Sequence, residues 1–112
     1  MKITTAAIVL ATAASFVLAA PSVRAGDATF EVSVKDHQFQ PAEFKATAGS
    51  AIVFKVKNLG AEPVEFESEP LQFEQVVKPN AEITVKVKPQ KPGRYVFFDD
   101  LHQDTKGALV IE

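Results

Sequence analysis

Apolar and polar residues alternate one by one in three separate segments of this chain. A period of two puts successive side chains on opposite faces of a β-strand, and a sheet that packs on a core needs one apolar face. Between residues 26 and 112 no apolar pattern with the helical period of 3.6 residues is present. The sequence therefore predicts an all-β fold. The alternating apolar positions are Phe30, Val32 and Val34, then Ile52, Phe54 and Val56, then Ile83, Val85 and Val87.

Further strands are expected at residues 62–67, 72–77, 93–98 and 107–111, because proline, glycine and asparagine separate these segments from their neighbours. Seven or eight short strands in a chain of 112 residues predict one domain and no more. We expect residues 26–112 to form a Greek-key two-sheet sandwich, or a small Greek-key barrel.

The first 25 residues have a different pattern. Lys2 is followed by an Ala-rich apolar run without a charge over residues 3–20, and Val23 and Ala25 place small residues before a cleavage point. These features are typical of a secretory signal peptide. A membrane anchor is the alternative, since the run approaches the length of a span, although Ala, Thr and Ser dilute it. We expect residues 1–25 to be a signal peptide and the protein to be periplasmic.

Charge and composition exclude several classes of function. The net charge is −2, with 12 basic and 14 acidic residues, so a basic nucleic-acid-binding protein is not indicated. The chain has no cysteine, which excludes disulfides, thiolate nucleophiles and thiolate metal centres. It has two histidines, too few for a three-His zinc site within one chain. No catalytic triad pattern, phosphate loop or HExxH motif is present, so a conventional enzyme is not indicated.

One acidic segment lies at residues 62–69. Glu65 and Glu67 share the strand face opposite Val64 and Phe66, and Glu74 follows on the next expected strand. Carboxylates stacked in this way repel one another. Solvent, a lysine on the neighbouring strand, or a bound cation can compensate, so a solvated face and a metal site are both open interpretations.

A second unusual segment covers residues 95–102. Tyr95, Phe97 and Asp99 have the same parity, so a carboxylate ends an aromatic row that faces the core. An ionised buried Asp is costly unless it is paired, hydrogen-bonded or coordinated. His102 follows three residues later, in the expected loop before the last strand, and its imidazole can approach the same point. Each residue alone also fits a structural role, Asp99 as a loop cap and His102 as a surface histidine.

The two ends of the domain together resemble the cupredoxins. Residues 36–50 read DHQFQPAEFKATAGS and are followed by a strand that ends at Asn58, as in the opening of that family. Residues 93–102 read GRYVFFDDLH and are followed by TKGALVIE at 105–112. The family pattern there is Gly-x-Tyr-x-Phe-x-Cys-x-x-His, then Met-x-Gly and a final strand. The resemblance implies a cupredoxin-like sandwich.

The copper ligands of that family are mostly absent. Asp99 stands at the thiolate position, Thr105 at that of the axial methionine and Val64 at that of the first histidine; His102 alone matches. A blue-copper centre requires the cysteine sulfur, so this chain cannot form one.

The Glu-Phe-Glu-Ser segment, Leu71, Glu74 and residues 97–102 resemble one subgroup most. Its members are small periplasmic cupredoxin-like components of bacterial ferrous-iron uptake systems of the Ftr/Efe type. The resemblance implies a protein that binds iron or copper and assists ferrous iron oxidation or delivery. The implied partners are a membrane iron permease and other periplasmic iron-uptake components, with no nucleic acid, and a monomer or weak dimer.

Replacing sulfur by carboxylates favours harder cations such as Fe(III), Mn(II) or Cu(II). We expect His102 to supply the nitrogen ligand, and His37 to be a surface residue. A copper-binding or copper-storage relative and a metal-free interaction module are the alternatives, since a fold does not fix a function. The candidate oxygen ligands are Asp99 or Asp100, and a second acidic group made of Glu65, Glu67 and Glu74.

Overall fold

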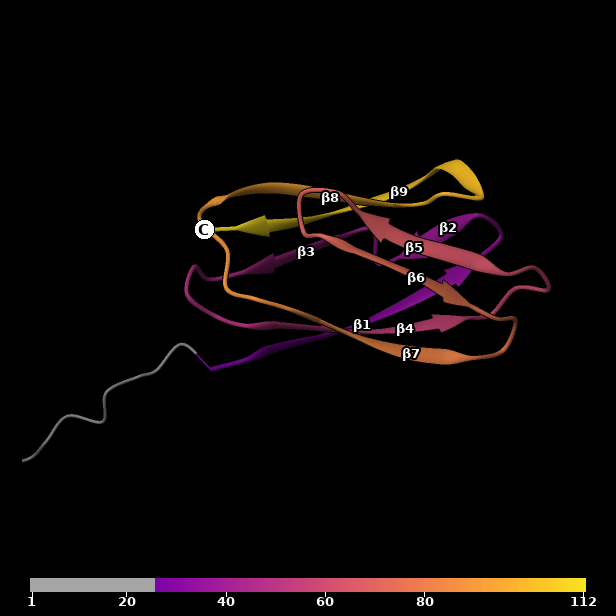
Figure 1. Ribbon diagram of the computed structural model, residues 1–112, viewed down its shortest axis with the longest axis horizontal. Helices are drawn as coiled ribbons and strands as arrows, with labels where there is room; N and C mark the ends of the chain where they lie inside the picture. The colour runs from indigo at the N-terminus through magenta and orange to yellow at the C-terminus, as the bar shows by residue number, and fades with distance from the viewer. Residues whose placement is uncertain (1–25) are drawn as a thin grey trace, which may run out of the picture.

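The computed structural model describes residues 26–112 and is all-β, as predicted (Figure 1). The predicted signal peptide, residues 1–25, lies outside the described residues. Within residues 26–112 no helix has the length and apolarity to cross a membrane. The strands are β1 (Ala28–Lys35), β2 (Gln38–Gln40), β3 (Glu43–Ala46), β4 (Ile52–Asn58), β5 (Val64–Ser68), β6 (Phe73–Val77), β7 (Glu82–Val87), β8 (Gly93–Asp99) and β9 (His102–Ile111).

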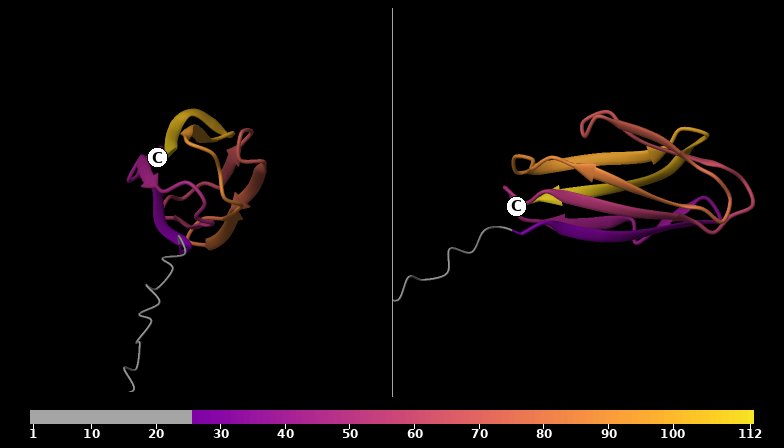
Figure 2. Two further views of the ribbon diagram at one scale, coloured as in Figure 1. Left: turned by 90° about the vertical axis from the view of Figure 1, so that its left-hand side faces the viewer. Right: turned by 60° about the horizontal axis from the view of Figure 1, so that its bottom comes forward.

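The strands form two sheets that pack face to face, which confirms the predicted two-sheet sandwich (Figures 1 and 2). One sheet has four strands in the order β2-β1-β4-β7, and the other has five in the order β3-β9-β8-β5-β6. Two neighbouring pairs are parallel, β1 with β4 and β3 with β9, and the other pairs are antiparallel. Residues of both sheets form one buried cluster, so each sheet contributes one apolar face to a shared core.

Phenylalanine rings from both sheets meet in the centre of this core. Phe54 of β4, Phe66 of β5 and Phe97 of β8 are fully buried. Their ring centroids lie 5.2 to 5.9 Å apart, within the range of favourable aromatic pairs. The alternation predicted for β4 is confirmed, because Ile52, Phe54 and Val56 are all buried while Lys55 and Lys57 are exposed.

The described part of the chain has nine strands where seven or eight were expected. The two additional strands, β2 and β3, have three and four residues and flank Pro41. Segments this short are too brief to display an alternating pattern. The last strand also begins at His102, five residues before the predicted start, because Lys106 pairs with Phe98 and, after a register shift, His102 pairs with Asp99. His102 is therefore the first residue of β9 and does not lie in a loop.

The connections β1 to β2, β4 to β5, β6 to β7 and β8 to β9 gather at one end of the sandwich, the right-hand end in Figure 1. The parallel pairing of β1 and β4 brings Val34 beside Asn58, so these two strands end together. The backbone N–H of Glu65, near the start of β5, donates to the side chain of Asp99 at the end of β8, 3.0 Å away. The topology thus places residues from distant parts of the sequence on one rim.

Candidate metal centre

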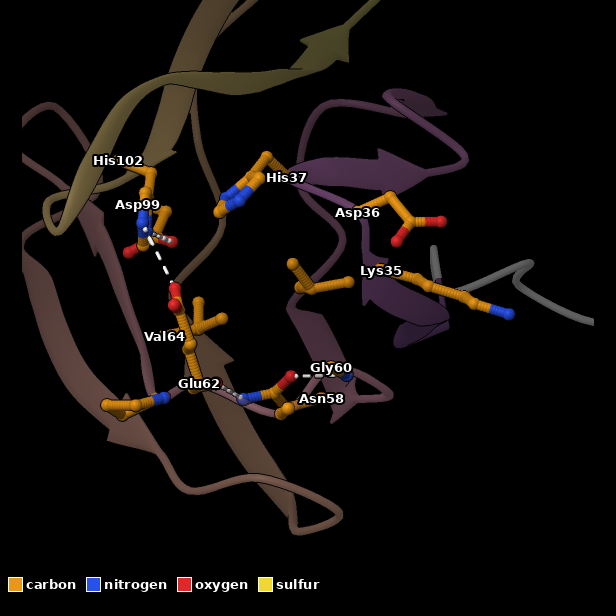
Figure 3. A pocket seen from close by; sticks show the side chains of 12 residues that line it. Lys35, Asp36, His37, Asn58, Gly60, Glu62, Val64, Asp99 and His102 are labelled. Atoms are coloured by element: carbon orange, nitrogen blue, oxygen red, sulfur yellow. Dashed lines mark hydrogen bonds and ion pairs between the residues drawn. The ribbon is translucent and has the colours of Figure 1, made fainter.

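Two histidines and one glutamate converge on this rim (Figure 3). His37, Glu62 and His102 each offer a ligand atom, and these atoms lie within 4.8 Å of one another. The Nε2 atom of His102 lies 3.3 Å from a carboxylate oxygen of Glu62, and the two imidazole rings lie 4.2 Å apart. Metal–ligand bonds of about 2.0–2.2 Å keep donor atoms roughly 3–4 Å apart, so small side-chain rotations would complete the set.

The ring of His102 is held on its other side by a buried carboxylate. Its Nδ1 atom lies 3.3 Å from Oδ2 of Asp99, whose side chain is 2% exposed. The Oδ1 atom of Asp99 accepts hydrogen bonds from the backbone N–H groups of Glu65 and Leu101, at 3.0 and 3.1 Å. Asp99 therefore turns Nε2 of His102 towards Glu62. Metal-binding histidines usually have such a partner on the nitrogen that faces away from the metal.

His37 lies in the tight turn between β1 and β2. Lys35 pairs with Gln38, so Asp36 and His37 form a two-residue turn, and their φ angles are 51° and 58°. Positive φ at both central residues is what a type I′ hairpin turn requires. The side chains of Lys35 and Asp36 point away from His102, whereas that of His37 points towards it (Figure 3). The turn thus selects His37 for the rim.

Glu62 lies in the connection between β4 and β5, which a buried asparagine organises. The Nδ2 group of Asn58 donates to the carbonyl oxygens of Glu62 and Val77, at 2.7 and 3.0 Å, and its Oδ1 accepts from the N–H of Gly60 at 2.9 Å. The pocket between the β1–β2, β4–β5 and β8–β9 connections has a volume of about 210 Å³. At about 30 Å³ per water, it has room for an ion and several waters.

The predicted acidic group forms a second cluster on the outer face of the five-stranded sheet. Carboxylate oxygens of Glu65, Glu67 and Asp100 lie within 4.8 Å of one another, and Glu67 pairs across the sheet with Glu74 and Phe98. A hydrogen bond with Glu74, desolvation and the neighbouring negative charges raise the pKa of Glu65 to about 7. Desolvation, followed by the charge of Glu74, also raises the pKa of Glu67. The compensating lysine is absent from the strand positions paired with Glu67.

The structure thus divides the six predicted ligands into two places. Asp99 and His102 meet at the rim, as expected, while Asp100 lies with the glutamates. The assignment of all six residues as metal ligands stays a prediction. His37 is exposed, as expected, but its ring packs against that of His102 at a tilt of 48°, and sequence reasoning did not select it or Glu62. One feature could have identified both residues: the turn at residues 36–37 and the connection after Asn58 both follow strands that end at the same rim.

The usual copper position of cupredoxins has no equivalent donor set. Val64 and Thr105, which occupy the positions of the first histidine and of the methionine, are both buried, and Asp99 replaces the thiolate. A carboxylate and a hydroxyl beside an apolar side chain do not fit a thiolate copper centre. The group of His37, Glu62 and His102 therefore shares His102 with that copper position and takes its other two side chains from elsewhere.

Comparison with known proteins gives relatives of the same fold. The chain is 35% identical over 81 residues to an uncharacterized protein of Rickettsia prowazekii; the match covers 72% of this chain and 65% of that protein's length. The structure is similar to the metal-binding domain of the Streptococcus pneumoniae Cu(I)-exporting P-type ATPase CopA, solved with Cu(I), with a TM-score of 0.66, 15% identity and coverage of 75% and 84% of the two chains.

It is also similar to reduced auracyanin from the photosynthetic bacterium Roseiflexus castenholzii, with a TM-score of 0.65, 16% identity and coverage of 78% and 98%. At these identities the likeness shows the fold alone. The model of one family, described as a cupredoxin-like domain, matches residues 7–111. The protein therefore belongs to the cupredoxin-like domain family, and it does so without a blue-copper site.

Proposed function

We propose that this protein binds one metal ion, Fe(II) or Cu(II), between His37, Glu62 and His102. The observation that carries the proposal is the environment of His102, whose two ring nitrogens lie 3.3 Å from Asp99 and 3.3 Å from Glu62. Asp99 is buried and bound by two backbone N–H groups, so it orients the ring. Glu62 is exposed and faces the pocket, so it is free to share a metal with Nε2.

The donor types suggest which metals fit. Two imidazoles with one carboxylate are a donor set that suits Fe(II) and leaves further coordination positions open, while imidazole also suits copper. The pocket around the three side chains would let water or an exchanging ligand take those positions. Ions that enter and leave such an open site are more easily delivered than ions in a closed structural site.

We further propose that the protein works in the periplasm, as an accessory of ferrous-iron uptake that delivers iron to a membrane permease or assists its oxidation. The support is the resemblance of residues 62–74 and 97–102 to components of those systems, the pattern of residues 1–25, and a donor set without sulfur. The carboxylate of Glu62 would favour Fe(III) over Fe(II) and so lower the reduction potential of bound iron.

A copper-binding role is the second candidate. It is supported by the similar fold of a Cu(I)-bound domain from a copper exporter and of auracyanin. The two roles differ in vivo: deletion of the gene should impair growth on limiting iron if the protein serves iron uptake. It should leave iron-limited growth unchanged if the protein serves copper alone.

Isothermal titration of the purified protein with Cu(II), and with Fe(II) under anaerobic conditions, tests the metal site directly. We expect one ion per chain and a loss of affinity of at least about tenfold in His102→Ala. Gln103→Ala, an exposed neighbour on β9, is the matched control and should bind as the wild type does. No heat with either metal, and no difference between His102→Ala and wild type, would contradict the proposal.

A further inference from the structure

A buried hydroxyl ties the turn that carries His37 to the opposite sheet. The Oγ1 atom of Thr105 on β9 donates a hydrogen bond of 2.8 Å to the backbone carbonyl of His37. Thr105 is 2% exposed, and its partner lies 68 residues away in the sequence. This bond therefore joins the rim of the four-stranded sheet to the strand that begins with His102.

The His37 turn has reason to need such an anchor. Asp36 and His37 both have positive φ, a conformation that costs free energy in residues other than glycine and persists where surrounding structure holds it. The ring of His37 is exposed, so burial does not fix it. Its direction follows from its backbone and from its contact with the ring of His102, 4.2 Å away.

We propose that Thr105 is a positioning residue for metal binding. Its hydroxyl fixes the His37 backbone and so keeps that imidazole within reach of Glu62 and His102. The proposal rests on the metal site proposed above. In the resemblance to cupredoxins, Thr105 takes the position of the axial methionine, which binds the metal there. In this protein, Thr105 would affect metal binding through its hydrogen bond to the backbone of His37, without a bond to the metal.

Thr105→Val tests this, because valine keeps the shape of the side chain and removes the donor. One lost hydrogen bond between neutral groups should weaken Cu(II) binding about three- to tenfold in isothermal titration. Thr105→Ser restores the hydroxyl and should bind within about twofold of wild type. Wild-type affinity in Thr105→Val would overturn the proposal.

A double-mutant cycle with His37→Ala separates positioning from general destabilisation. If Thr105 acts through His37, Thr105→Val should weaken Cu(II) binding in the wild-type background and have no further effect in His37→Ala. An equal loss in both backgrounds would show that Thr105 supports only the stability of the fold, and would overturn the proposal.

A readout without metal distinguishes failure of this inference from failure of the proposed function. The contact with the ring of His102 should shift the ring-proton NMR resonances of His37 in the metal-free protein. Thr105→Val should move them towards free-histidine values, and Thr105→Ser should not. Unchanged His37 resonances in Thr105→Val would refute the anchor, whereas a wild-type protein that binds neither Cu(II) nor Fe(II) would refute the metal site.

Discussion

The replacement of Asp99 by asparagine is the most informative single change at the rim. The Oδ1 atom of Asp99 accepts hydrogen bonds from the N–H groups of Glu65 and Leu101, so an asparagine keeps its oxygen there. Its NH₂ group then occupies the position of Oδ2, 3.3 Å from Nδ1 of His102. An NH₂ group donates and does not accept, so Nδ1 must become the acceptor and the ring proton moves to Nε2. A protonated Nε2 cannot bind a metal.

The expected loss follows from this change of tautomer. Removing the carboxylate partner of a metal-binding histidine typically costs about 10- to 100-fold in metal affinity, equivalent to about 1.4–2.7 kcal/mol. Both backbone hydrogen bonds to the side-chain oxygen are kept, so the free energy of unfolding should fall by only about 1–2 kcal/mol. The affinity and the stability therefore respond to different features of the same substitution.

Isothermal titration with Cu(II) and thermal unfolding of the metal-free protein measure these two quantities. Asp104→Asn makes the same chemical change at an exposed position of β9 and is the matched control. It should alter neither quantity. If Asp99→Asn is folded and binds Cu(II) within about twofold of wild type, the orienting role of Asp99 is refuted.

Three further predictions concern the core and the acidic cluster. Phe97→Ala should lower the free energy of unfolding by about 3–5 kcal/mol in denaturant titration, because it removes a fully buried ring; a loss below about 1 kcal/mol would contradict the packing described. Gly107→Ala should cost about 1–3 kcal/mol, because a Cβ there would lie 2.4 Å from ring atoms of Phe97 and 2.8 Å from the carbonyl oxygen of Ala42; unchanged stability would show that the ring can move aside. The pKa of Glu65 rises on folding from 4.5 to about 7, so its contribution favours the folded state below pH 4.5 and is lost as the pH rises through 7. Glu74→Gln should reduce the change in the free energy of unfolding between pH 4.5 and pH 7, measured by denaturant titration at several pH values. The same pH dependence in the variant and in wild type would contradict the effect of Glu74 on the pKa of Glu65.

The fold was predictable because one physical pattern runs through most of the strands. Residues of β4 and β7 alternate so regularly that a single buried face follows from the sequence, and the structure confirms it. The short strands β2 and β3 could not be found in this way, since three or four residues carry no period. The early start of β9 escaped prediction because residues 102–106 are polar, and because a register shift separates the pairing of His102 with Asp99 from the regular pairs after it.

The site was predictable only in part, for a related reason. Asp99 and His102 are three residues apart, so local spacing brought them together in the prediction. His37 and Glu62 lie far from them in the sequence, and their approach depends on which strands end at the same rim. That depends on the parallel pairing of β1 with β4 and on the turn at residues 36–37, neither of which a local pattern reveals.

The anomalous scattering of copper in a crystal of the metal-loaded protein tests the central claim most directly. We expect one strong peak at the rim, about 2.0–2.2 Å from Nε2 of His102, a ring nitrogen of His37 and a carboxylate oxygen of Glu62. A peak among Glu65, Glu67 and Asp100 with none at the rim, or no ordered peak at all, would contradict it.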